Sequence, residues 1–234
     1  MAFWGMWFFA QTAQMLDLIW GMVFTQLAVI ALPGIAAVAW LGLPMKEQLS
    51  LRAPTARDGM MAIAVGLLAP AVGLLVFHLQ SLVMPAPASL QEEMAKMLSD
   101  DLPLLVTLVV FAVLPGLCEE VLFRGALFGL MRRGDHPWLA IALNAVMFGV
   151  FHLFLHRWLP TGILGLLMCI AVWRSRSLWV GVVIHSLNNA VLLTIARTLP
   201  DPETSEVPWL VLGVMASAAF ALVFAMRGPS EVRS

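Results

Sequence analysis

The chain carries little charge: only 12% of its 234 residues are Asp, Glu, Lys or Arg, whereas 61% are hydrophobic. A soluble domain of this length would carry roughly twice that charged fraction. Together with a mean hydropathy of +0.92, the scarcity of charge excludes an ordinary soluble protein and predicts an integral membrane protein. Tyrosine is absent while tryptophan occurs 9 times, which fits a chain whose interfacial aromatic anchors are all indoles.

Cysteine is scarce as well. Cys118 and Cys169 lie within apolar runs and match no paired metal or redox spacing, so we interpret both as small buried residues. The N-terminal stretch MAFWGMWFFAQTAQ lacks the basic region and the small-residue cleavage site of a secretory signal. We therefore expect this stretch to be retained in the protein.

Long apolar runs are abundant. A helix needs about 20 apolar residues to cross a bilayer, and the runs that approach this length lie near 18–42, 59–84, 103–131, 137–155, 158–173, 177–198 and 207–226. The fifth run is short for a full span, and the first sixteen residues could add a further helix. We therefore predict an all-α fold in one domain, 1–234: a polytopic transmembrane helix bundle of seven spans, or eight if the N-terminal stretch adds one.

Basic residues predict the orientation of this bundle. With seven spans, one side holds nine Lys and Arg residues, which are Lys46, Arg52, Arg57, Arg132, Arg133, Arg174, Arg176, Arg227 and Arg233. The other side holds three, which are Lys96, Arg157 and Arg197. Because an excess of Lys and Arg marks cytoplasmic loops, we predict an outside N-terminus and a cytoplasmic C-terminus, in a prokaryotic plasma membrane.

The remaining basic residue, Arg124, stands inside a predicted span, in the stretch CEEVLFRG at 118–125. On a helix, Glu120 and Arg124 are four residues apart and can form a charge pair, whereas Glu119 points about 100° away. Ionisable residues in a membrane usually face the bundle interior or a water-filled cavity, and they are commonly functional. Glu120 and Arg124 could equally serve helix packing, but Glu119 is a candidate functional residue.

Two later spans carry polar residues at membrane depth. Asn144, Phe148 and His152 recur every four residues on one helix, and His185 and Asn189 have the same spacing on another. Each of these polar residues alone could simply hydrogen-bond between helices. At about 1.5 Å of rise per residue, however, both histidines reach depths near that of the glutamate pair. Three helices could therefore bring a carboxylate, two imidazoles and an amide into one pocket.

The three patterns, EExxxR at 119–124, FxxxH at 148–152 and HxxxN at 185–189, resemble in this order the motifs of the CAAX prenyl protease 2 and bacteriocin-processing (CPBP, also called Abi) family of intramembrane endopeptidases. The resemblance covers about 103–195, so we expect a motif-bearing catalytic core at about 103–198, while the N-terminal helices in 1–100 carry no recognised motif. It implies hydrolysis of a peptide bond in a membrane-embedded or membrane-proximal protein, such as a lipidated or leader-bearing one. We expect the bilayer as a partner and no nucleic acid.

The resemblance also implies roles for individual residues. It assigns water activation to Glu119 with His152 and oxyanion stabilisation to His185 with Asn189. The chemistry agrees, because a carboxylate in an apolar site becomes a useful general base, and each donor aimed at an oxyanion contributes roughly 3 kcal/mol. The supporting residues are Glu120, Arg124 and Phe148.

Three alternatives stay open. Glu119, His152 and His185 form a two-histidine, one-carboxylate set such as catalytic zinc sites use. We favour the metal-free mechanism, without a cofactor, because Asn189 suits oxyanion binding and is an unusual zinc ligand. Outside the peptidases, buried Glu, His and Arg could form the relay of a proton-coupled transporter. Finally, the motif residues could stabilise a non-catalytic membrane scaffold or immunity protein.

Overall fold

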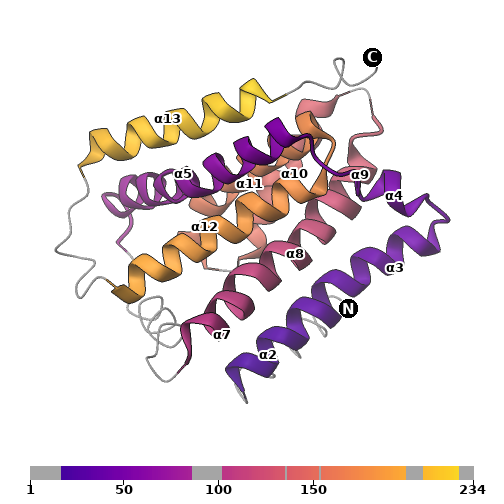
Figure 1. Cartoon of the computed structure of the whole chain (residues 1–234), viewed down its shortest axis with the longest axis horizontal. Helices are drawn as coiled ribbons and strands as arrows, with labels where there is room; N and C mark the ends of the chain where they lie inside the picture. The colour runs from indigo at the N-terminus through magenta and orange to yellow at the C-terminus, as the bar shows by residue number, and fades with distance from the viewer. Residues whose placement is uncertain (1–16, 86–101, 135, 153, 199–207, 227–234) are drawn as a thin grey trace.

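The computed structural model describes residues 17–85, 102–134, 136–152, 154–198 and 208–226, and within these ranges it contains helices and no β-strand (Figure 1). The elements, of which those marked η are π-helical, are α2 (Leu18–Phe24), η1 (Thr25–Ala31), α3 (Leu32–Trp40), α4 (Met45–Gln48), α5 (Ala56–Ser81), α7 (Leu104–Leu108), η2 (Val109–Val113), α8 (Leu114–Glu120), η3 (Val121–Leu127), α9 (Phe128–Met131), α10 (Pro137–Phe151), α11 (Leu155–Ser175), α12 (Leu178–Thr198) and α13 (Trp209–Ala225). The all-α prediction is confirmed.

Each of the seven expected runs contains a helix, but they are not all of spanning length. Five are long and apolar enough to cross a membrane: Leu18–Trp40, Ala56–Ser81, Leu104–Met131, Leu155–Ser175 and Leu178–Thr198. The other two, α10 and α13, have 15 and 17 residues, which at 1.5 Å per residue cover only about 22 and 26 Å of a roughly 30 Å hydrocarbon core. The prediction of seven spans is therefore not confirmed, and the stretch that could add an eighth helix lies outside the described residues.

The boundary between the fourth and fifth runs also differs from the prediction. The sequence predicts one helix to 155 and a short one from 158, whereas α10 ends at Phe151 and α11 begins at Leu155. The backbone N–H of His152 bonds to the Gly149 carbonyl, which closes α10 in a tight turn. The fifth helix therefore gains length, to 21 residues, at the expense of the fourth.

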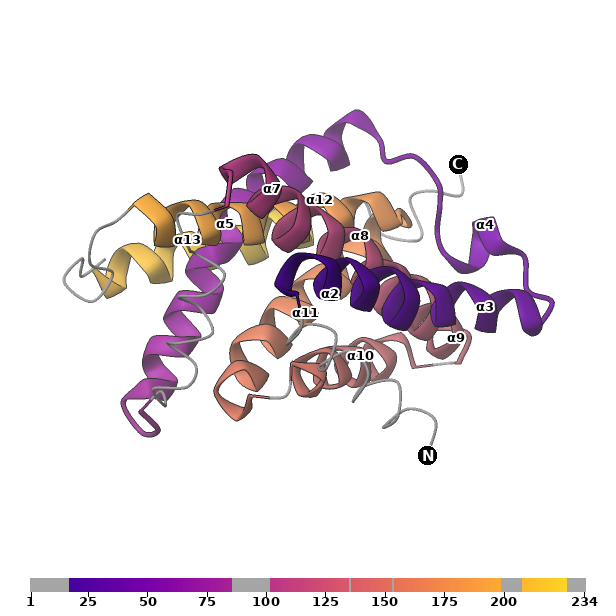
Figure 2. The same cartoon turned by 90° about the horizontal axis from the view of Figure 1, so that it is seen from below.

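The long helices lie side by side. In Figure 1, α13, α5, α12 and the α7–α9 rod follow one another across the view, with the α2–α3 rod at the far edge. Figure 2 shows α10 beside α11, and α11 also packs against α5. Helix α12 packs against both α5 and α8, and α10 packs along α11. The α2–α3 rod contacts the rest of the bundle mainly through α8 and η3. This places the first span directly beside the motif that contains both glutamates.

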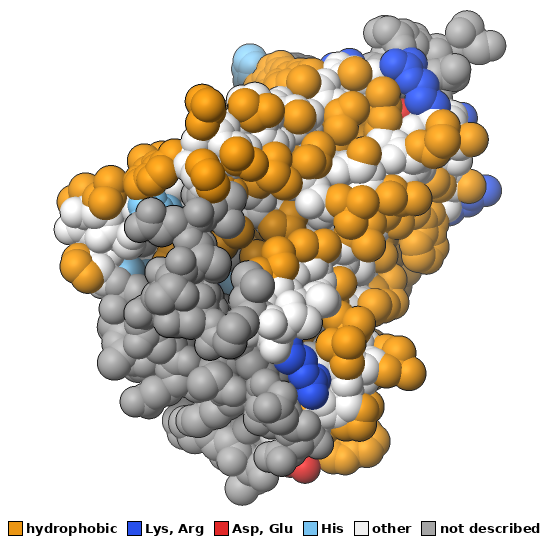
Figure 3. Space-filling model, turned by 60° about the vertical axis from the view of Figure 1, so that its left-hand side comes forward, with side chains coloured by type: hydrophobic (Ala, Val, Ile, Leu, Met, Phe, Trp, Pro, Cys, Tyr) orange, Lys and Arg blue, Asp and Glu red, His pale blue; other side chains and the backbone are white. Residues whose placement is uncertain are grey.

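Side chains from α5, the α7–α9 rod, α10, α11, α12 and α13 form one hydrophobic core. Its fully buried members include Phe128, Phe148, Leu167, Met168 and Ile184. The outer surface is also apolar. Figure 3 shows hydrophobic side chains over most of the described surface on that face, and exposed examples include Leu67, Leu105 and Val146. An apolar exterior around a packed core is the arrangement of a helix bundle surrounded by lipid.

The loops at one end of the bundle are held together by hydrogen bonds. Arg132 Nη2 donates to the Glu47 carbonyl (2.9 Å), Arg133 Nη2 to Gln48 Oε1 (2.8 Å), and Ser177 Oγ to the Arg52 carbonyl (2.7 Å). Burial and the charges of Arg176 and Arg133 lower the pKa of the Arg132 guanidinium. Several basic residues that the sequence assigns to one side of the membrane thus share one end of the described structure.

Candidate active site

The first motif lies where α8 passes into η3, and its charge pair is fully buried. Arg124 Nη1 lies 2.7 Å from Glu120 Oε1, and both side chains are 0% exposed. The predicted pairing across one helical turn is confirmed. Burial of both charges is tolerable because each neutralises the other, and because Arg124 Nη2 donates a second bond to the Gly165 carbonyl of α11 (3.0 Å).

Glycines allow the neighbouring helices to approach this pair. A Cβ atom at Gly165 would lie 2.8 Å from Phe148 Cδ1 and 3.3 Å from Arg124 Nη2. A Cβ atom at Gly181, on α12, would collide with Glu120 Oε2. Both positions therefore require glycine for space.

Glu119 faces away from Arg124, as its position on the helix predicts, and receives a different partner. Its Oε1 accepts a hydrogen bond from Gln26 Nε2 (3.0 Å), which comes from η1 in the first span. Its Oε2 lies 3.9 Å from His185 Nε2. Glu119 and Gln26 are 7% and 4% exposed, so both polar groups are withdrawn from the surroundings.

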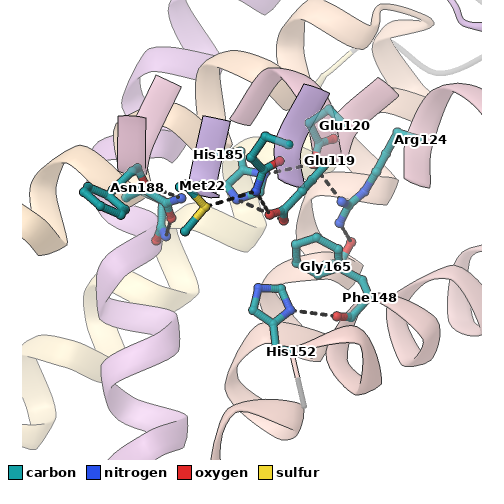
Figure 4. Close-up of polar contacts among 12 residues, drawn as sticks. Met22, Glu119, Glu120, Arg124, Phe148, His152, Gly165, His185 and Asn188 are labelled. Carbon is teal, nitrogen blue, oxygen red and sulfur yellow. Dashed lines mark hydrogen bonds and ion pairs between the residues drawn. The ribbon is translucent and has the colours of Figure 1, made fainter. Parts of the chain in front are cut away.

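His185 lies between the two glutamates. Its Nδ1 is 3.2 Å from Glu120 Oε1 while its Nε2 faces Glu119 (Figure 4). Because Glu120 is already paired with Arg124, the His185 ring is oriented by a carboxylate that is itself held in place. A connected chain thus runs from Arg124 through Glu120 and His185 to Glu119, and from there to Gln26 on the first span.

Phe148 and His152 approach the site from α10. The Phe148 ring lies under the Arg124 guanidinium, with 4.2 Å from its centroid to Cζ. It also makes edge contacts with His152 and His185, at centroid distances of 4.9 and 5.7 Å. The third residue of the stripe, Asn144, donates to the Phe123 carbonyl (2.8 Å) and is buried. The predicted stripe therefore does face the first motif.

His152 is the residue directly after α10 and is only partly buried. Its Nδ1 lies 2.9 Å from the Phe148 carbonyl, which can accept only from an N–H, so Nδ1 carries a hydrogen in this arrangement. In the neutral ring the other nitrogen, Nε2, is then free to accept a proton. His152 thus joins the site through Phe148, as Figure 4 shows.

Asn189 lies one turn beyond His185 on α12 and is partly buried. Its Nδ2 donates a long bond to the Phe111 carbonyl (3.5 Å), and its Oδ1 accepts from Asn188 (3.1 Å). Phe111 stands four residues before Pro115, and proline has no N–H to offer to that carbonyl. Because its bond to Phe111 is long, the Asn189 amide is weakly held.

Gln26 was not predicted from the sequence. It lies in the part of the chain without a recognised motif, and the signal that could have identified it is a lone amide within an otherwise apolar span. Gly165 and Gly181 were missed for another reason. Their importance depends on how α11 and α12 pack against Glu120 and Arg124, which spacing along the chain does not express.

The zinc alternative requires Glu119, His152 and His185 to converge as ligands. Among the described residues, no group of three or more His, Cys, Asp or Glu side chains is placed to hold a metal ion. The Nδ1 atoms of the two histidines face the Phe148 carbonyl and Glu120, which leaves Nε2 as the ring atom that could bind a metal. The metal-free mechanism therefore stays a prediction.

In this helix bundle, the buried carboxylate of Glu119 and the imidazole of His185, which the Glu120–Arg124 pair orients, form one polar site. Such a site is that of a membrane protein with an intramembrane polar centre. Residues 101–191 match the family model described as Type II CAAX prenyl endopeptidase Rce1-like, and this match supports the resemblance to the CPBP and CAAX protease 2 family that the three motifs predict. Comparisons with curated proteins and with solved structures gave no match. The family match supports a CAAX-type protease acting on a membrane-associated protein, and neither the transporter nor the scaffold alternative has better support.

Proposed function

We propose that this protein is an intramembrane endopeptidase in which Glu119, together with His152, activates water to hydrolyse a peptide bond of a membrane-associated protein. The observation that carries the proposal is the division of partners between the two adjacent glutamates. Glu120 is neutralised by Arg124, whereas Glu119 contacts a neutral amide and an imidazole. Only Glu119 is therefore left as a carboxylate that can take a proton from water.

In this mechanism, Glu119 accepts a proton from water as the water oxygen attacks the scissile carbonyl carbon. The carbonyl oxygen becomes an oxyanion, which N–H groups of His185 and Asn189 stabilise. The tetrahedral intermediate then breaks its C–N bond, and the proton passes to the leaving amine. His152 Nε2 lies on the ring edge opposite its bond to Phe148 and is suited to share this proton.

The oxyanion role falls to one particular nitrogen of His185. Since its Nδ1 faces Glu120, Nε2, which lies on the side of Glu119, is the ring nitrogen that would donate to the oxyanion.

For Asn189, the oxyanion role requires its amide to leave the Phe111 carbonyl. The 3.5 Å bond is at the limit of hydrogen-bond length, so its loss costs little. We also propose that the end with the basic loops faces the cytoplasm, since Lys and Arg are enriched in cytoplasmic loops.

The test compares protein termini in membranes that contain the wild-type protein with those that contain the Glu119→Gln variant at equal abundance. Mass spectrometry of new N- and C-termini should identify at least one cleavage site that depends on Glu119. Identical sets of termini in the two membranes would contradict the proposal. The cleaved protein also supplies a substrate for measurements on purified enzyme.

A further inference from the structure

Gln26 lies outside the residues that match the family model, on a different span from every motif. It is nevertheless 4% exposed and donates to Glu119 at 3.0 Å. Burying an amide in apolar surroundings is costly unless the amide is hydrogen-bonded. We propose that Gln26 is a positioning residue for the reaction, holding the Glu119 carboxylate by Oε1 so that Oε2 is presented to water; this inference rests on the proposed peptidase function.

The chemistry of the amide favours this role over simple helix packing. Arg124 binds Glu120 in a full ion pair. Gln26 instead fixes the orientation of Glu119 with a neutral donor, which favours the ionised carboxylate less than a full positive charge does. Glu120 is thus bound in an ion pair, whereas Glu119 is oriented without one to an arginine.

Unpartnered acceptors at the pair point to a donating ligand. Among the described residues, Glu119 Oε2 and Gln26 Oε1 are both buried without a hydrogen-bond donor. Such oxygens are costly to bury unless a donor reaches them. A water molecule, or an N–H group of a bound peptide, supplies the hydrogens that these two oxygens need. Gln26 thus contributes an acceptor of its own besides holding Glu119.

The packing of the first span places Gln26 beside Glu119. Gln26 lies in η1, which contacts α8, and π-helical segments are frequent at functional sites because they turn side chains out of the regular helical register. The segment precedes Pro33, which lacks the N–H that an α-helix would use at that point. The contact of η1 with α8 therefore places Gln26 next to the Glu119 carboxylate.

The test uses Gln26→Met, which keeps the length of the side chain and removes both polar atoms. Gln80→Met is the matched control, because Gln80 is also a membrane-helix glutamine that donates one bond, to the His156 carbonyl (3.2 Å), and has a buried unpartnered oxygen. With the substrate identified from the termini, Gln26→Met should lower kcat by about 10–100-fold, the worth of a hydrogen bond to a charged group. KM should stay within about threefold, and Gln80→Met should retain wild-type kcat.

A second measurement needs no substrate. Dicyclohexylcarbodiimide reacts with protonated carboxyl groups in apolar surroundings, and mass spectrometry of the peptide that contains Glu119 and Glu120 locates the adduct. Without the donor that favours its ionised form, Glu119 should be modified about threefold faster or more in Gln26→Met than in the wild type or Gln80→Met. Glu120, which keeps Arg124, should react equally in all three proteins.

The inference stands only if Gln26→Met changes both kcat and the rate at which Glu119 is labelled. Unchanged labelling of Glu119, or a kcat of Gln26→Met within twofold of the wild type, overturns it while leaving the peptidase proposal intact. A wild-type protein that cleaves nothing contradicts both the peptidase proposal and the positioning role. The labelling rate still shows whether Gln26 binds Glu119. If Gln26→Met does not fold, Gln26→Leu is measured in its place.

Discussion

The imidazole of His185 lies against Glu120, with Nδ1 3.2 Å from Oε1. This is the same oxygen that accepts the 2.7 Å bond from Arg124. A pair of residues that the sequence identifies as structural support thus determines how a candidate catalytic ring is oriented. The relationship links stability and activity, because any change that moves Glu120 should also move His185.

Arg124→Ala should reduce the amount of folded protein as well as its activity. Removing the guanidinium leaves Glu120 as an unpaired charge at 0% exposure, a loss on the order of 3–5 kcal/mol. Fluorescence-detected size-exclusion chromatography and thermal melting in detergent measure the effect. Arg57→Ala is the control, since Arg57 is an exposed arginine whose Nη2 donates to the Ala225 carbonyl (3.1 Å). An Arg124→Ala protein that accumulates normally and stays fully active refutes the pairing argument.

Gly181→Ala should be destabilising, although alanine is the better helix former. The new methyl group would collide with Glu120 Oε2 and lie 2.8 Å from Val172 Cγ2, and overpacking of this kind costs about 1–3 kcal/mol. Gly73→Ala is the matched control in α5, because a Cβ atom there meets nothing within 4 Å. The melting temperature should fall for Gly181→Ala and stay equal or rise for Gly73→Ala. Equal melting temperatures for the two variants would show that α12 does not approach Glu120 this closely.

His185→Ala and Asn189→Ala should each lower turnover by roughly 100-fold or more while leaving the protein folded, because each removes one donor to the oxyanion. Thr194→Val on the same helix is the control, since its hydroxyl donates within α12, to the Ala190 carbonyl (2.7 Å). Single-turnover rates on monodisperse protein are the appropriate measurement. Turnover of both alanine variants within twofold of the wild type rules out the oxyanion assignment.

Chelators should leave activity unchanged, and metal analysis of the same sample should find zinc well below one equivalent. The reason is geometric: the described residues contain no group of three His, Cys, Asp or Glu side chains placed to hold a metal ion. Stoichiometric zinc, with activity lost on chelation and restored by zinc, would replace this mechanism with a metallopeptidase that uses the same residues.

Much of the fold follows from the sequence because a membrane imposes simple rules. Each of the seven apolar runs contains a helix, and the spacing of Glu119, Glu120 and Arg124 predicts which glutamate pairs with the arginine. The number of spans was not predictable from the runs, because helix ends depend on local turns. The turn at His152 shortened one helix and lengthened the next.

The candidate site was predictable only in part, and the limits have a physical cause. Motif spacing expresses which residues share a helix face, so it identified Glu119, His152 and His185. Contacts between helices that are distant in sequence have no such signature. Gln26 reaches Glu119 across 93 positions of the chain, and this contact exists because the first span packs against α8.

The central claim is that Glu119 is the base that activates water. Its most direct test is the cleavage rate of a substrate identified in membranes, measured on purified and folded wild-type, Glu119→Gln and Glu120→Asp proteins. The account predicts hydrolysis by the wild type, partial activity of Glu120→Asp, which keeps a carboxylate for Arg124, and no measurable cleavage by Glu119→Gln. Cleavage by Glu119→Gln at a rate near that of the wild type would contradict it.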